Sequence, residues 1–130
     1  MNVLFIEDDA LNRRVVKDML CVVGADMAEA ADARTGLEMI DATDYHVILM
    51  DLRMPGMDGE AAIKVIRARG DRKAQLPVIV VTADTAIDLR ERCLHSGADE
   101  VLRKPIAMGP LLNAMGKMMA KRSAASLTIG

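Results

Sequence analysis

The chain has 130 residues, a formal net charge of −2 and a pI near 5.7, with 52% hydrophobic and 28% charged residues. This length fits one domain with its own hydrophobic core. One Phe, one Tyr and no Trp leave few base-stacking platforms, and the chain is not basic, so no nucleic-acid surface is expected. No apolar run reaches the roughly 20 residues of a membrane span, and residues 1–6 lead directly into acidic residues, unlike a signal peptide.

Short aliphatic runs alternate with helical patterns along the chain. The runs lack polar alternation, as strands buried on both faces of a parallel sheet do, and the helical segments place apolar residues on one face. In chain order we expect strand Asn2–Ile6, helix Leu11–Val23, strand Asp26–Ala30, helix Ala33–Ala42, strand His46–Met50, helix Gly59–Ala68, strand Pro77–Val81, helix Ala86–Ser96, strand Glu100–Leu102 and helix Met108–Ala120.

This order of elements predicts an α/β fold, a doubly wound five-stranded parallel sheet with helices on both faces. Residues 1–120 would form the domain. Residues 121–130 are small and polar without periodicity, which predicts a flexible tail or a linker stub. Cys21 and Cys93 lie in helical patterns among aliphatic residues, so we expect buried, reduced thiols, which suit a cytoplasmic protein.

Reactive side chains follow the expected strands at one end. Glu7 and Asp8 end the first strand, Asp51 the third and Thr82 the fourth, and Lys104 follows the fifth. Ligands of doubly wound sheets bind outside these carboxyl ends. Carboxylates gathered in one crevice repel one another, and a hard cation relieves the repulsion. An all-oxygen set of ligands suits Mg²⁺ better than a softer metal, so the sequence predicts a Mg²⁺ site.

The same side chains fit phosphoryl transfer. A carboxylate beside the ion can attack phosphorus and form an acyl phosphate, while the metal neutralises charge on the phosphoryl oxygens. Lys104 can pair with one phosphoryl oxygen and the Thr82 hydroxyl can donate to another. Each residue alone has an ordinary explanation, such as a surface lysine or a strand threonine. Asp9, the extra acid, is better explained as the N-cap of the helix starting at Leu11.

Four segments resemble the receiver domain of bacterial two-component signalling, over residues 1 to about 120: VLFIEDDALNRR, VILMDLRMPGMDG, VIVVTAD and GADEVLRKPI. The resemblance implies the flavodoxin-like receiver fold, (βα)5, with Asp51 as the phosphoacceptor. It implies that Asp8 binds Mg²⁺ directly, that Glu7 acts through water, and that Arg53 offers its backbone carbonyl.

The resemblance also assigns Thr82 and Lys104 as the switch hydroxyl and the lysine, and implies a cis peptide before Pro105. Such a domain is a phosphoacceptor that assists its own phosphorylation and dephosphorylation rather than an enzyme. The segments EDDALNRRVV and DLRERCLHSGADEVLRKPI are most similar to receivers of hybrid histidine kinases and of stand-alone phosphorelay regulators. By analogy, a histidine kinase or a histidine phosphotransfer protein would dock on Leu11–Val15 and Pro105–Met108.

Three positions bear on how the site behaves. Val101 stands where the family usually has Tyr or Phe, so the aromatic readout of threonine movement should be muted. Either the output surface is read differently or the domain mainly carries phosphoryl groups, which we favour. Arg53 and Asp84 lie two residues after the acceptor and the threonine, and we expect an ion pair there that restricts attacking water. The alternative is two independent surface charges.

Other functions fit the sequence less well. A flavodoxin-like electron carrier should bring phosphate-binding Ser/Thr and flavin-stacking aromatic residues. A phosphatase of the haloacid dehalogenase type should have a general acid two residues after its nucleophile, where this chain has Arg53. A receiver that never takes phosphate would not need the full set of acidic, hydroxyl and lysine groups. Met1 directly before the first strand mildly favours a complete chain, with the receiver fragment of a hybrid kinase as the alternative; the oligomeric state stays open.

Overall fold

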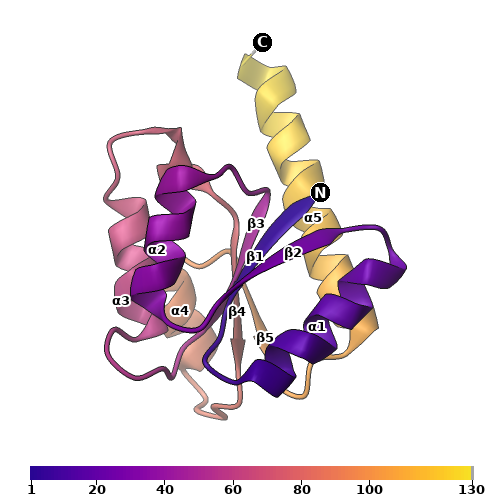
Figure 1. Cartoon of the computed structure of the whole chain (residues 1–130). Coiled ribbons are helices and arrows are strands. Elements are labelled where there is room, and N and C mark those ends of the chain that lie inside the picture. The colour runs from indigo at the N-terminus through magenta and orange to yellow at the C-terminus, as the bar shows by residue number, and fades with distance from the viewer. Residues whose placement is uncertain (130) are drawn as a thin grey trace.

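A computed structural model describes residues 1–129 of the chain, with side chains described through Lys121. One parallel sheet lies between two layers of helices (Figure 1). The strands are β1 (Asn2–Ile6), β2 (Asp26–Ala30), β3 (Val47–Asp51), β4 (Val78–Thr82) and β5 (Glu100–Arg103). The helices are α1 (Ala10–Val22), α2 (Ala33–Ala42), α3 (Gly59–Arg67), the 3-10 turn η1 (Arg72–Gln75), α4 (Leu89–Ser96) and α5 (Met108–Ile129).

The strand order within the described residues is β2-β1-β3-β4-β5, and every pair is parallel. The chain therefore winds in one direction from β1 to β2 and in the other from β3 to β5, as the sequence predicted. The order reverses between β1 and β3, which lie side by side. Residues that follow these two strands consequently meet at one edge of the sheet, where doubly wound folds bind their ligands.

Two hydrophobic cores explain the unbroken apolar strands. Alternate side chains of a strand point to opposite faces, so β1 places Leu4 and Ile6 in one core and Val3 and Phe5 in the other. Helices α2, α3 and α4 cover the first face and α1 and α5 the second (Figure 1). Every residue of β3 and β4 is buried. Strands with both faces covered need long apolar runs, which is the pattern of β3 and β4 up to their last residues, Asp51 and Thr82.

Two helices differ from their expected bounds by more than one residue. Helix α4 begins at Leu89 rather than Ala86, because the Asp84 carboxylate accepts the backbone N–H of Ala86 and holds this segment in a turn. Helix α5 continues past Ala120 to Ile129, through a segment that contains Lys, Arg, Ala and Leu and neither Gly nor Pro. The separation of residues 121–130 as a flexible tail or linker stub stays a prediction, with Gly130 outside the described residues. No helix in residues 1–129 is both long and apolar enough to cross a membrane.

The two cysteines have different environments. Cys93 on α4 is fully buried, as expected. The same expectation was wrong for Cys21, which is exposed. Helix α1 buries Val16 and Leu20, four residues apart, and the position after Leu20 is turned away from that narrow buried stripe.

Arg67, at the end of α3, connects this helix to the segments that precede β4 and β5. These contacts lie at the amino ends of the strands, away from the carboxyl ends described above. Its guanidinium donates to the carbonyls of Ala74 and Leu76 at 2.7 Å, to the Gly97 carbonyl at 2.9 Å and to Asp99 Oδ2 at 3.0 Å. The side chain is 23% exposed, so water replaces these bonds poorly. This arginine thus anchors α3 to the segments on either side of β4.

Replacing Arg67 should test this anchor. We expect Arg67→Met to lower the free energy of unfolding by about 2–3 kcal/mol, because three carbonyls lose a charged donor. Urea denaturation measures the change. Arg14→Met is the matched control, since the Arg14 side chain is 77% exposed, and it should change stability by less than about 0.5 kcal/mol. Equal effects of the two variants would contradict the assigned role.

Candidate functional site

Glu7 directly follows β1 and is completely buried. Its backbone N–H donates to the Ala30 carbonyl at 2.9 Å, and its carbonyl accepts from Arg13 Nη1 at 2.6 Å. The carboxylate is held from one side only: Oε1 accepts from Lys104 Nζ at 2.6 Å and from Asn12 Nδ2 at 3.0 Å. Oε2 is buried without a hydrogen-bond partner. A buried carboxylate oxygen without a donor is costly, which makes this atom a candidate cation ligand.

Asp51 is the last residue of β3 and is 5% exposed. Lys104 Nζ, which bonds Glu7, lies 3.5 Å from Asp51 Oδ1. The lysine follows β5, and its backbone N–H donates to the Thr82 carbonyl at 2.8 Å, which fixes it beside the end of β4. The expected cis peptide between Lys104 and Pro105 is confirmed. One ammonium group thus faces two buried carboxylates from two different strands.

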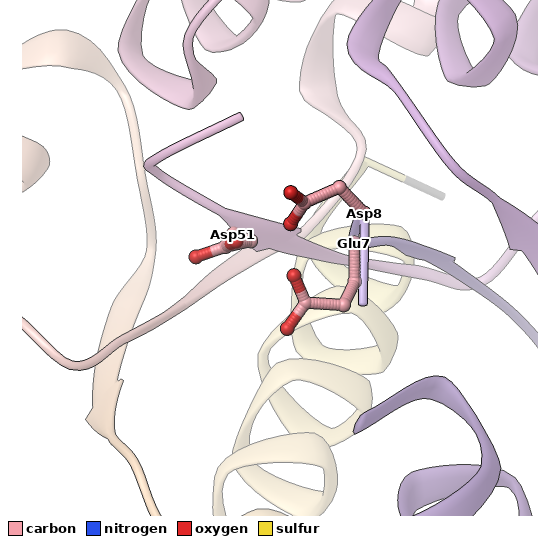
Figure 2. Close-up of side chains that lie close together, drawn as sticks. All are labelled: Glu7, Asp8 and Asp51. Atoms are coloured by element: carbon pink, nitrogen blue, oxygen red, sulfur yellow. The ribbon is translucent and has the colours of Figure 1, made fainter. Parts of the chain in front are cut away.

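Three carboxylates gather at this end of the sheet. Oxygen atoms of Glu7, Asp8 and Asp51 lie within 4.8 Å of one another. Figure 2 shows the Glu7 and Asp8 carboxylates, from the end of β1, turned to the side on which Asp51 lies. They open into a cavity of about 240 Å³, which has room for a cation and several waters. Its lining is Glu7, Asp8, Asp9, Asn12, Asp51, Arg53, Thr82, Ala83 and Lys104.

Asp9 is not one of the three gathered acids. Its Oδ1 accepts the backbone N–H of Leu11 at 2.8 Å and that of Asn12 at 3.2 Å. This confirms the prediction that Asp9 is the N-cap of α1. The cap fixes the first turn of α1 beside the acidic cluster.

The expected Arg53–Asp84 ion pair is present at 3.1 Å, and of the two residues Arg53 lines the cavity. The Arg53 side chain is 79% exposed, so the pair by itself adds little stability. Asp84 is held by further contacts: its backbone N–H donates to Thr82 Oγ1 at 3.1 Å, and its carbonyl accepts from Arg103 Nη1 at 2.8 Å. Thr82 itself is buried. The threonine, the loop after it and β5 are thereby connected by hydrogen bonds.

The sequence did not indicate two residues that shape the site, Asn12 and Gly59. Asn12 bonds Glu7, and only its position in the first turn after a capping acid could have indicated this. Gly59 begins α3, and a Cβ there would clash with the backbone oxygen of Asp51. A glycine is therefore required for the helix to start against the strand end that carries Asp51. The expected helix, Gly59–Ala68, began at this glycine, but the sequence did not indicate the close approach.

The expected docking residues are partly accessible. On α1, Leu11 is 70% exposed and Val15 is 42% exposed. Ile106, which follows the cis proline, is half-buried and packs against the second core. Val101 on β5 is half-buried against the first core and does not line the cavity.

Burial and proximity separate the pKa values of the two buried acids. Burial, followed by the neighbouring Glu7 carboxylate, raises the pKa of Asp51 to about 7. Burial also acts to raise the pKa of Glu7, but interactions with the Asp51 carboxyl group, Lys104 and Asn12 outweigh it and lower that pKa to about 2. Without a cation, the pair therefore shares one proton below about pH 7 and loses it above.

Comparison with known proteins identifies the family. Residues 3–116 match the model of the response regulator receiver domain. The chain belongs to this family. It is a receiver domain of two-component signalling, a family of phosphoacceptors that work with histidine kinases or phosphotransfer proteins. The resemblance drawn from the sequence is thereby confirmed, and the electron-carrier and phosphatase alternatives have no support from these matches.

A sensor histidine kinase and a transcriptional regulator are among the relatives that match. The chain is 35% identical over 108 residues to the sensor histidine kinase RcsC of Escherichia coli, covering 83% of this chain and 11% of the kinase. It is 33% identical to the transcriptional regulatory protein HprR of the same species, covering 99% of this chain and 56% of the regulator. The chain thus spans about a tenth of the length of RcsC and about half of the length of HprR.

A solved receiver has the same fold and a metal in its cleft. The receiver domain of the sensor histidine kinase PA1611 from Pseudomonas aeruginosa is 30% identical, with a TM-score of 0.83 over 92% of this chain and 97% of that one. That crystal structure contains a magnesium ion coordinated in the active-site cleft.

The pKa of Asp51 predicts a pH dependence of stability. In the fold the pKa is about 7, against 3.8 for an unperturbed aspartate, so between these values the folded state binds a proton that the unfolded state has lost. The free energy of unfolding of the cation-free protein should therefore fall as pH rises from about 5 to about 7. Below about pH 4.5 the lowered pKa of Glu7 has the opposite effect. There the unfolded state binds the extra proton, so this carboxyl group makes the free energy of unfolding rise with pH.

Urea denaturation at several pH values, with a chelator present, measures this slope. Asp51→Asn should remove it, because the amide does not titrate. Asp44→Asn should keep it, since the Asp44 side chain is 76% exposed. An unchanged slope in Asp51→Asn would contradict the shared proton.

Proposed function

We propose that this domain receives a phosphoryl group on Asp51 within a two-component phosphorelay, with Mg²⁺ as its cofactor. The observation that carries the proposal is the asymmetric environment of Glu7 beside Asp51. One Glu7 oxygen is bonded to Lys104, and the other is buried without a donor next to two more carboxylates. Such a cluster favours binding of a divalent cation together with an anionic group.

The residues present fit Mg²⁺. Their donor atoms are hard oxygens, few enough to leave room for water, as Mg²⁺ prefers. Glu7, Asp8 and Asp51 would hold the ion, with the backbone carbonyl of Arg53 as a further ligand. When bound, the ion supplies charge neutralisation for the phosphoryl oxygens.

The side chains divide the chemistry among them. An oxygen of Asp51 attacks phosphorus as the bond from phosphorus to a histidine nitrogen of the donor breaks, and the bonding electrons return to the imidazole. Lys104, already 3.5 Å from Asp51, pairs with a phosphoryl oxygen. The Thr82 hydroxyl accepts the Asp84 N–H, which leaves its own proton available for donation to another phosphoryl oxygen.

The donor would be a histidine kinase or a histidine phosphotransfer protein, in the cytoplasm. Exposed Leu11 and Val15, with the loop Pro105–Met108, form the proposed docking surface. We favour a role as phosphoryl carrier, because Val101 cannot alternate between exposed and buried states as an aromatic ring does. A receiver that forms part of a longer hybrid kinase is the alternative, since one of the relatives above is a sensor kinase.

Phosphotransfer profiling tests the proposal. Incubation with phosphorylated kinases and phosphotransfer proteins should label the wild-type chain in the presence of Mg²⁺, and Asp51→Ala should abolish the label because the attacking oxygen is gone. Asp44→Asn, at an exposed aspartate, should be labelled normally. Label retained on Asp51→Ala would overturn the assignment.

The Arg53–Asp84 pair should slow loss of the phosphoryl group by restricting water. We expect Arg53→Ala to hydrolyse the acyl phosphate about two- to fivefold faster, as fits an exposed pair worth about 0.5–1 kcal/mol. Decay of labelled protein after removal of the donor measures the rate. Arg53→Lys keeps a positive charge at this position, and its decay rate should lie between those of the wild type and Arg53→Ala. Unchanged decay in Arg53→Ala would mean that the two charges act independently.

A further inference from the structure

The Glu7 carboxylate accepts hydrogen bonds from Lys104 and Asn12, and Asn12 is the uncharged donor of the two. Its Nδ2 donates to Glu7 Oε1 at 3.0 Å, from the first turn of α1. The residue is half-buried and lines the cavity that holds the acidic cluster. Lys104 donates to the same oxygen at 2.6 Å. Two donors on Oε1 fix the plane of the carboxylate and leave Oε2 free.

The position of Asn12 is itself fixed. Asp9 caps α1 and accepts the backbone N–H of Asn12 at 3.2 Å, so the start of the helix is tied to the end of β1. Arg13 then holds the Glu7 carbonyl at 2.6 Å. Both the helix turn and the strand end are therefore restrained, and the Asn12 side chain bridges a short, defined gap.

The two donors on Oε1 differ in how permanent they are. In the proposed function Lys104 turns to a phosphoryl oxygen, and Glu7 then loses its charged partner. Asn12 has no such competing task and can hold the carboxylate throughout. A neutral amide is also suited to the place: a cation there would compete with the metal, and another carboxylate would have no proton to donate.

We propose that Asn12 is a positioning residue for divalent cation binding, which holds Glu7 so that its unpartnered Oε2 faces the cation. This inference rests on the proposed Mg²⁺ site and adds a residue to it. Partners of this kind orient a metal ligand without touching the metal, and their loss commonly weakens metal binding about 10- to 100-fold.

Orientation matters more for Mg²⁺ than for Ca²⁺, because Mg²⁺ demands near-octahedral geometry whereas Ca²⁺ accepts irregular sites. Asn12→Leu removes the donor and nearly keeps the shape. We expect it to raise the Mg²⁺ dissociation constant about tenfold and to raise that of Ca²⁺ by clearly less. Isothermal titration calorimetry on the whole chain measures both constants. General damage to the fold would instead raise both dissociation constants by the same factor.

Asn113→Leu is the matched control, because it makes the same change at an exposed position of α5 outside the cavity lining. It should leave both constants unchanged. Asn12→Ser, whose hydroxyl is too short to reach Glu7, replaces the leucine variant if that variant does not fold. Equal weakening of the two ions, or no weakening, would overturn the role of Asn12 while the Mg²⁺ site stands. Failure of the wild-type chain to bind Mg²⁺ would overturn the site and this inference together.

Discussion

The site depends on one buried carboxylate that is satisfied on one side only. Glu7 is enclosed at the end of β1, with Oε1 bonded and Oε2 left without a donor. The cost of this arrangement is relieved by a shared proton with Asp51 or by a cation, and these two solutions exclude each other. The fold therefore keeps a local instability at the place where a metal and a phosphoryl group are proposed to bind. Stability and function are linked through the same atoms.

The surroundings of Thr82 offer connections that do not involve an aromatic side chain. Its hydroxyl accepts the Asp84 N–H, and the Asp84 carbonyl accepts from Arg103 on β5. Val101, on the same strand, packs against the core instead. A movement of Thr82 would thus act on the hydrogen bonds of Asp84 and Arg103, in which Val101 takes no part. This arrangement is compatible with a carrier, in which little needs to move, and with an output surface that is read through polar groups.

The sequence predicted the order of the elements and the gathering of Glu7, Asp8 and Asp51 at one end of the sheet, because both follow from local patterns. Buried parallel strands need unbroken apolar runs, and strand ends in this topology place their reactive groups together. It did not predict that Glu7 has one free oxygen, because this depends on where Lys104 and Asn12 meet it in space. Nor could it show that α4 starts at Leu89, since a side-chain turn at Asp84 competes with the helix. Cys21 was misjudged because burial on α1 is confined to a narrow stripe.

The most direct test of this account is a Mg²⁺ titration of the isotope-labelled chain, followed by backbone amide chemical shifts at neutral pH. We predict saturable shifts centred on residues 7–9, on 51–53 and on the segment around Lys104, with release of about half a proton per ion at pH 7 as the Glu7–Asp51 pair gives up the proton that it shares. Shifts that never saturate, or that centre away from these segments, would contradict the claim that this buried acid pair is built for a cation.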